Sequence, residues 1–319
     1  MKASGWLLVD GGRWLLVDGG KRLATSKRHL ITLYAANLLL GWSTTFGLSS
    51  RIGAVTGSSL YSERLAHGFD LGVFLELINK PEIAPYSQVP VALVFAGLFV
   101  VLQLFLTGGI ITQFLAAQQV DRPRFYAACG ENFWKMVRIA LVFVLVAGLA
   151  GGILHAIRTA LDVATENSAN RQAALALQTG MLLIEALALL WVRMWFDLAQ
   201  TQLVANGTPG IRSSIAYGFK SARRAARLYG SYVLLGILTS LLVALGIYLW
   251  WVAAPASQVI VSFLILQSTL GYLLVLRWWQ RALTAAWYQR HTPLAAAIEL
   301  VSLEPLPPES AIPEVPLSQ

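Results

Sequence analysis

The sequence predicts an all-α integral membrane protein, a six-transmembrane helical bundle built of three helical hairpins. Hydrophobic residues make up 56% of the 319 residues and charged residues only 13%, about half the charged share of a typical soluble protein. A water-soluble domain of this size has no interior large enough to hide so much apolar surface. Six stretches supply the roughly 20 apolar residues that a spanning helix needs. They are residues 30–48, 89–113, 137–157, 174–195, 229–252 and 258–276.

These spans divide the chain into three parts. Residues 1–29 form a cytoplasmic N-terminal segment, and residues 30–301 form the membrane domain. Residues 302–319 are rich in proline and glutamate and contain no lysine or arginine, so we expect a disordered cytoplasmic tail. Residues 49–87 form an external loop whose histidine and acidic residues match no closed metal motif. We therefore expect an amphipathic surface helix there, with no metal and no cofactor.

The positions of lysine and arginine predict the orientation, because cytoplasmic loops of membrane proteins are enriched in both. With the N-terminus in the cytoplasm, all but five of the 24 basic residues fall on the cytoplasmic side. Both termini are then cytoplasmic, and the net charge of +8 is explained by contact with anionic headgroups of the bilayer. No basic and aromatic motif accompanies this charge, so we expect no nucleic acid partner. The five external residues are Arg51, Arg64, Lys80, Arg158 and Arg171.

A tandem repeat occupies the N-terminal segment. The run Trp-Leu-Leu-Val-Asp-Gly-Gly occurs at residues 6–12 and again at residues 14–20. Its Asp-Gly-Gly ends predict turns. Three interpretations are open: a short hairpin, a peripheral membrane anchor through Trp6 and Trp14, or a duplication without function. The apolar stretch that follows is too long for the core of a signal peptide, so we expect no cleavage.

A basic juxtamembrane helix is expected before each of the three hairpins, with Lys21–Arg28 entering the first span. The segments before the third and fifth spans match each other. Both segments have an arginine, an alanine, a glycine and a second basic residue at equal spacings, and the pattern predicts a basic face opposite an apolar one. Such helices lie in the membrane interface before the chain turns into the bilayer. The matching positions are Arg124, Ala128, Gly130 and Lys135 in one segment and Arg212, Ala216, Gly218 and Arg223 in the other.

Two interpretations of these helices are open. They form a platform that docks anionic lipid or partner proteins, or they are ordinary starting points of spanning helices. The expected contacts to lipid or partner are Arg124, Lys135, Arg138, Lys220, Arg223, Arg224 and Arg227, the last four as one stripe on a single helix. The expected apolar faces are Phe125, Cys129, Phe133 and Met136 in one helix and Ile215, Phe219, Ala222 and Ala226 in the other.

Small residues at four-residue spacing predict where the spanning helices pack, because lipid tails give helices no hydrophobic reason to associate. The third span offers Gly148 and Gly152, and the fifth offers Gly236, Ser240 and Ala244. We expect these faces to pack within the chain. Six helices supply internal partners, so homodimerisation is the less favoured interpretation.

Ionisable residues at membrane depth are candidates for function. Glu185 lies near the middle of the fourth span, and Asn37, Gln103 and Gln267 are polar residues of other spans that could face it. Either Glu185 belongs to a proton path with a raised pKa, or it is a neutral side chain hydrogen-bonded across helices, which we favour. For His155, near the outer end of the third span, a hydrogen bond to a neighbour is favoured over a pigment or haem ligand.

Catalytic motifs are absent. The sequence contains no nucleophile elbow, zinc-protease helix or phosphate-binding loop, so we expect no enzyme. The single cysteine, Cys129, excludes an intramolecular disulfide and a CxxC site. Arg193 and Asp197 stand four residues apart near the inner end of the fourth span, which predicts a pair between them.

Residues 108–135 combine Gly-Gly-Ile-Ile with Arg-Pro-Arg-Phe-Tyr-Ala-Ala-Cys-Gly and, shortly after, Phe-Trp-Lys. With six spans and basic juxtamembrane helices, this segment resembles a group of bacterial inner-membrane proteins. The group includes uncharacterised six-helix proteins and the membrane domain attached to some glycerophosphodiester phosphodiesterases. The resemblance implies a bacterial inner (plasma) membrane location. The sequence has no likeness to the soluble phosphodiesterase domain, so no activity or functional residue is expected from the resemblance.

Two functions remain as expectations. The first is a non-catalytic membrane protein with a structural or accessory role, which docks lipids or other membrane protein subunits. The alternative is a small transporter or lipid-handling protein with a polar intramembrane path around Glu185.

Overall fold

The chain folds as an all-helical membrane protein in the part that the structure describes. The computed structural model describes residues 4–56, 72, 76, 85–116, 120–165, 171–207, 210–253 and 259–292. Five of its helices are long and apolar enough to cross a membrane, as the composition predicts. The helices are α1 (Ser4–Thr25), α2 (Lys27–Thr56), α5 (Pro85–Ala116), α6 (Arg122–Thr165), α7 (Arg171–Ala205), α8 (Ile211–Ala222), α9 (Ala226–Ala253) and α10 (Val259–His291).

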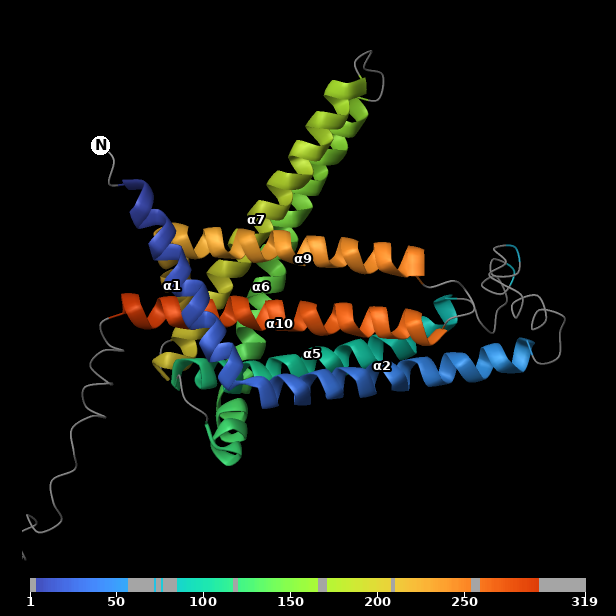
Figure 1. The fold of residues 1–319 in the computed structure, drawn as a ribbon, viewed down its shortest axis with the longest axis horizontal. Helices are drawn as coiled ribbons and strands as arrows, with labels where there is room; N and C mark the ends of the chain where they lie inside the picture. The colour runs from blue at the N-terminus through green and yellow to red at the C-terminus, as the bar shows by residue number, and fades with distance from the viewer. Residues whose placement is uncertain are drawn as a thin grey trace, which may run out of the picture.

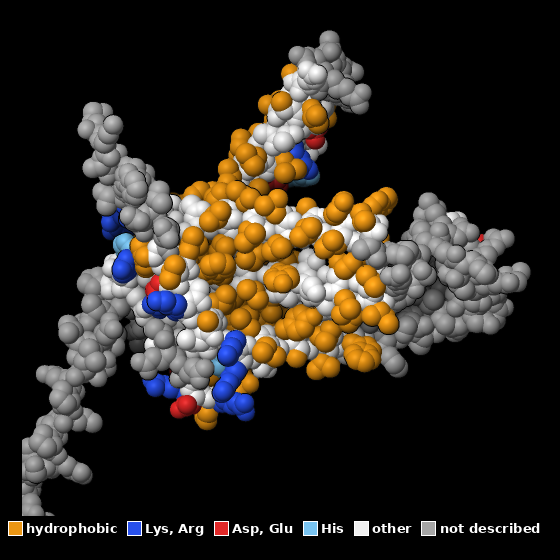
Figure 2. Space-filling model, viewed as in Figure 1, with side chains coloured by type: hydrophobic (Ala, Val, Ile, Leu, Met, Phe, Trp, Pro, Cys, Tyr) orange, Lys and Arg blue, Asp and Glu red, His pale blue; other side chains and the backbone are white. Residues whose placement is uncertain are grey.

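Four helices, α2, α5, α9 and α10, run alongside one another (Figure 1). Helix α2 contacts α5, α9 contacts α10, and α10 also contacts α2 and α5. Figure 2 shows a broad belt of hydrophobic side chains over this group. Large hydrophobic side chains of its helices are exposed, for example Leu241 of α9 and Phe263 of α10. Helices satisfy their own backbone hydrogen bonds, so such a belt suits a lipid solvent. Many of the hydrophobic residues of the sequence thus lie on the outer surface of the bundle.

Helices α6 and α7 form a hairpin that crosses this group and extends beyond it (Figure 1). Helix α6 is unbroken over 44 residues, a length of about 66 Å. The expected turn between a juxtamembrane helix and the third span is therefore wrong here. Met136 and Ile139, at the expected turn, are fully buried, and continuous packing with no proline or glycine at this point keeps the helix uninterrupted.

The apolar face at the start of α6 is buried inside the protein. Phe125, Cys129 and Met136 are almost fully buried, and this face packs against Gly108 and Gly109 of α5. A Cβ atom on Gly108 would lie only 2.8 Å from the Cβ of Asn132, so the glycines allow the two helices to touch closely. The expected amphipathic character is present, but the apolar face covers a neighbouring helix.

The basic segment before α9 is also organised differently from the expectation. Helix α8 ends at Ala222 and α9 begins at Ala226, and Arg223 and Arg224 lie in the turn between them. The predicted single stripe from Lys220 to Arg227 is therefore wrong, although all four basic side chains of that stripe are exposed.

The buried face of α8 is made of small residues. A Cβ atom on Gly218 would lie 2.7 Å from the backbone oxygen of Trp195, so α8 lies closely on α7. Phe219, expected on the buried face, has 39% of its surface exposed. The expected apolar face is thus rotated, because close packing selects small residues over large ones. The buried residues of α8 are Ser214, Gly218, Ser221 and Ala222.

The tandem repeat lies within the continuous helix α1, so the expected turns at Asp-Gly-Gly are wrong. In the second copy, Leu15 is 1% exposed and the guanidinium carbon of Arg290 lies 3.7 Å from the Trp14 ring centroid. A Cβ atom on Gly19 would lie 2.6 Å from Leu283. Packing of this copy on α10 overrides the weak helix propensity of glycine. The side chains of the first copy lie outside the described residues.

Several sequence expectations fall partly outside the described residues. The expected first span, 30–48, lies within α2, which continues to Thr56 and is not among the five candidate spans. Of the external loop 49–87, most of the stretch between α2 and α5 lies outside the described residues, and so does the tail 302–319.

The two glycines that match in the juxtamembrane segments test this packing directly. We expect Gly218→Ala to lower the free energy of unfolding by about 1–3 kcal/mol, because the new methyl group clashes with the α7 backbone. A methyl group on Gly130 would meet no described atom of a neighbouring element within 4 Å, so Gly130→Ala should be neutral or stabilising by about 0.5–1 kcal/mol. Unfolding midpoints of both variants in one detergent measure this, and equal effects would contradict the packing of α8 on α7.

Candidate functional site

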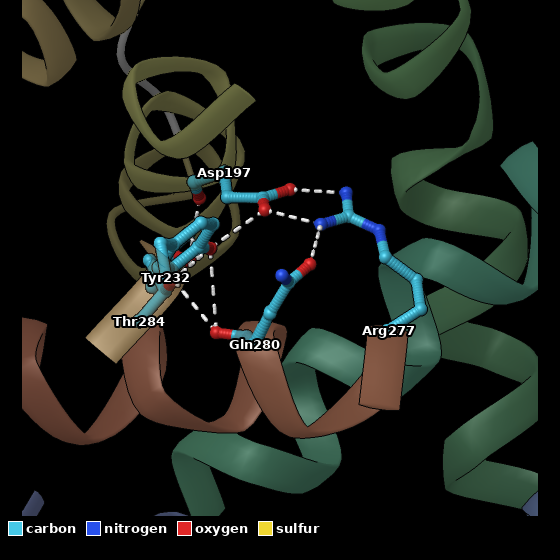
Figure 3. A network of polar contacts seen from close by, with 6 residues as sticks. Asp197, Tyr232, Arg277, Gln280 and Thr284 are labelled. Carbon is cyan, nitrogen blue, oxygen red and sulfur yellow. Dashed lines mark hydrogen bonds and ion pairs between the residues drawn. The ribbon is translucent and has the colours of Figure 1, made fainter. Parts of the chain in front are cut away.

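A buried polar cluster lies where α7, α9 and α10 meet (Figure 3). Asp197 of α7 is 3% exposed. Arg277 of α10 donates from Nη1 to Oδ2 at 2.6 Å and from Nη2 to Oδ1 at 2.7 Å. Tyr232 of α9 is fully buried and donates its hydroxyl hydrogen to the same Oδ2 at 2.7 Å. A two-point pair of this kind is the strongest form of charged hydrogen bond in proteins, and here one carboxylate joins three helices.

Residues of α10 hold this arrangement in place. Gln280 accepts a hydrogen bond at Oε1 from Arg277 Nη1 at 3.3 Å. The Thr284 hydroxyl lies 2.7 Å from the Tyr232 hydroxyl and 3.0 Å from the Gln280 backbone oxygen. Since the Tyr232 hydrogen goes to Asp197, Thr284 is the donor to one of these two oxygens. Arg277, Gln280 and Thr284 share one face of α10, as their spacing of three and four residues requires.

The cluster contains more positive than negative charge. Asp197 interacts electrostatically with Arg193 and Arg281 as well as with Arg277. Among the described residues, neither Arg193 nor Arg281 forms an ion pair. The Nε atom of Arg281 is buried and has no hydrogen-bond partner in the described part of the chain. Three guanidinium groups therefore share a single carboxylate.

The predicted pair between Arg193 and Asp197 is wrong. Asp197 pairs with Arg277, which reaches the carboxylate from the facing helix with both terminal nitrogens. Arg193 stands one turn before Asp197 on α7 and makes no hydrogen bond with it. The rule that residues four apart pair on a helix applies to exposed helices, and contact with α10 replaces it here.

A cavity of about 260 Å³ opens beside the ion pair. Charged and amide side chains line it together with aromatic rings. The Oε1 atom of Gln200 in its wall is buried without a partner among the described residues. The lining residues are Phe143, Arg193, Phe196, Asp197, Gln200 and Arg277.

Glu185 lies in the α6–α7 hairpin and has a basic partner. Its Oε2 atom is 3.6 Å from Nη1 of Arg158, and both side chains are mostly buried. Arg158 Nη2 lies 3.4 Å from Nδ1 of His155, so His155 contacts a neighbouring side chain, as expected. The partner of Glu185 in the structure is thus an arginine of α6.

The three amides expected to face Glu185 lie elsewhere. Gln267 of α10 accepts a hydrogen bond from the Tyr34 hydroxyl of α2 at 3.0 Å. Gln103 lies on α5 and Asn37 on α2, both partly buried. Among the described residues, no hydrogen bond or ion pair joins any of these amides to Glu185. The structure does not bring the four residues into one polar path.

The two predicted small-residue faces are mostly open. Gly236 does contact a neighbouring helix, since its Cβ would lie 3.0 Å from Leu190 of α7. A Cβ atom on Gly148 or Gly152 would meet no described atom within 4 Å. The search for small residues at four-residue spacing did not find Gly108 and Gly109, where α5 lies closely on α6. Two adjacent glycines in a spanning helix were the sequence signal for this contact. The exposed positions are Gly148, Gly152, Ser240 and Ala244.

The predicted lipid or partner contacts divide into two groups. Lys135 donates to the backbone oxygen of Gly207 at 2.8 Å, so it satisfies the carbonyl group just beyond α7. Arg22 of α1 does the same for α5, donating to the backbone oxygen of Phe114 at 2.6 Å. Basic side chains at helix C-termini are stabilising for this reason. The exposed group is Arg124, Arg138, Lys220, Arg223, Arg224 and Arg227.

Comparisons with protein-family models, with curated proteins and with solved structures find no match to this chain. The likeness of residues 108–135 to bacterial inner-membrane proteins therefore stays a prediction from the sequence. A proposal of function therefore depends on the groups described above, namely the buried cluster, the Glu185 pair and the exposed basic residues.

Removal of the buried carboxylate should destabilise the protein strongly. We expect Asp197→Asn to lower the free energy of unfolding by about 3–5 kcal/mol, because Arg277 then keeps a buried charge without its counter-charge. Glu185→Gln is the matched control and should cost at most about 1 kcal/mol, since its ion pair is longer and partly exposed. Denaturation of both variants in the same detergent gives the comparison. A loss at Glu185 as large as that at Asp197 would contradict the assignment.

Proposed function

We propose that this chain is a non-catalytic accessory protein of a bacterial inner membrane, which holds anionic lipid headgroups at its cytoplasmic end. The supporting observation is the separation of charge and apolar surface in Figure 2, where lysine and arginine side chains gather at one end beside the hydrophobic belt. Each basic residue close to an anionic membrane surface contributes about 1 kcal/mol of attraction.

The exposed basic residues lie at helix ends that this orientation puts on one side. Lys27 and Arg28 begin α2, Arg122 and Arg124 begin α6, and Arg290 is near the end of α10. Alternate helix ends face the same side of a membrane in a multi-pass chain. The proposal therefore keeps both termini in the cytoplasm and uses the exposed arginines as lipid contacts.

The proposal also counts α2 as a sixth span. Its 30 residues correspond to about 45 Å of helix, which is enough to cross a bilayer core of about 30 Å. It lies alongside α5, and it contacts both α5 and α10 (Figure 1). With α2 included, the three pairs α2–α5, α6–α7 and α9–α10 correspond to the three expected hairpins.

The alternative of a transporter or lipid-handling protein has less support. It needs a polar path around Glu185, but Glu185 is paired with Arg158. The amides that would continue such a path belong to α2, α5 and α10, and no contact among the described residues joins them to Glu185. A docking function needs no such path.

The exposed turn between α8 and α9 provides the test. We expect the double variant Arg223→Gln and Arg224→Gln to reduce the enrichment of phosphatidylglycerol around the protein, by about fivefold per residue removed. The measurement is the lipid composition retained from mixed phosphatidylcholine and phosphatidylglycerol nanodiscs, and added salt should weaken the enrichment. Arg158→Gln, near the opposite membrane face, is the control and should leave enrichment unchanged. Equal enrichment in the double variant and the parent would contradict the proposal.

A further inference from the structure

We infer that the cavity between α6, α7 and α10 is a binding site for a phosphate group, held by Arg193 and Arg277. The cavity lies beside the Asp197–Arg277 pair and has room for about 260 Å³. A water molecule takes about 30 Å³ in the liquid, so a phosphate group with some of its hydration fits.

The first argument is the uncompensated charge. Arg277 is neutralised by Asp197, whereas Arg193 and Arg281 interact with this same carboxylate and form no ion pair of their own among the described residues. Both side chains are partly buried, and an unpaired charge that is partly removed from water is destabilising. An anion in the cavity would offset this cost, and Arg193 lines the cavity directly.

The second argument is the chemistry of the wall. A guanidinium group presents a planar fork of donors that matches phosphate oxygens, and it carries its charge at any physiological pH. Gln200 adds an unpartnered buried amide, and a half-turn of that amide presents Nε2 as a further donor. Asp197 also lines the cavity, but both of its oxygens accept hydrogen bonds from Arg277.

The third argument is depth. Arg193 and Arg277 lie at the predicted inner ends of residues 174–195 and 258–276, where the hydrocarbon meets the headgroups. Trp195, which is only partly buried, follows Arg193 by two residues on α7, and tryptophan is enriched at membrane interfaces. A phosphate group reaches this depth either as the headgroup of a phospholipid or as free phosphate from the cytoplasm.

This inference rests on the proposed function only for the placement of the cluster at the cytoplasmic face. It concerns the partly buried residues that line the cavity, whereas the proposed function concerns exposed ones. Failure of one can therefore be told from failure of the other. If the Arg223 and Arg224 variants lose lipid enrichment while the cavity binds nothing, only the present inference fails.

The test uses the full chain in an uncharged detergent after exchange to remove bound lipid. Sodium phosphate replaces sodium chloride at constant ionic strength, and in a second arm phosphatidylglycerol replaces phosphatidylcholine in nanodiscs. We expect the unfolding midpoint of the parent to rise saturably, by about 5 °C at a hundredfold excess over the dissociation constant. Arg193→Gln should abolish the rise with sodium phosphate and should reduce the rise with phosphatidylglycerol, part of which comes from the exposed arginines. By removing an unpaired charge, it should unfold no earlier than the parent without ligand. Arg212→Gln, on the exposed side of α8, is the control that keeps the response.

The two arms identify the source of the phosphate. A rise with sodium phosphate in detergent indicates a soluble phosphate ligand, and a rise with phosphatidylglycerol alone indicates a lipid headgroup. Loss of the sodium phosphate response in Arg193→Gln, or a smaller response of that variant to phosphatidylglycerol, supports the site. The inference is overturned if the parent responds in neither arm, or if Arg193→Gln responds as the parent does.

Discussion

The buried pair between Asp197 and Arg277 is the interaction on which the inner end of this protein depends. A carboxylate that is 3% exposed is stable only when its charge is matched and its oxygens are hydrogen-bonded. Arg277 and Tyr232 meet both demands from two other helices. Because the hydrogen bonds are short and directional, they fix the positions of α7, α9 and α10 relative to one another. The far end of the α6–α7 hairpin extends beyond the bundle (Figure 1), so this pair is an anchor for α7.

Because Asp197 pairs with Arg277, the positive charges of the neighbouring arginines are not balanced in the described part of the chain. One carboxylate is fully used by Arg277, and the neighbouring Arg193 and Arg281 remain without a counter-charge among the described residues. A protein in water would solvate such groups, whereas a membrane protein has anionic headgroups within reach at this depth. The exposed arginines and the buried cluster both favour a ligand that carries a negatively charged phosphate group. The proposed accessory role rests on that agreement.

Composition and hydropathy predicted the helical class and the positions of α5, α6, α7, α9 and α10, because the requirement for about 20 apolar residues is local in the sequence. Non-local contacts decided the rest. Asp197 pairs with Arg277, which is 80 residues away in the sequence. The local rule of four-residue spacing predicted a pair with Arg193 instead. Gly130 and Gly218 match in sequence, yet only Gly218 lies against another helix. The helical form of the tandem repeat likewise depends on the packing of Leu15 and Gly19 in the protein interior, where Gly19 lies against Leu283 of α10. Such a long-range contact cannot be predicted from a local sequence pattern.

A double-mutant cycle on Asp197 and Arg277 tests the central claim most directly. The free energies of unfolding of Asp197→Asn, Arg277→Gln and the double variant are compared with that of the parent in one detergent. If the pair anchors α7 to α10, the second substitution should cost far less once the first is present, with a coupling energy of about 1.5–3 kcal/mol. Effects that add to within about 0.5 kcal/mol would show that the two residues act independently, and they would contradict the account.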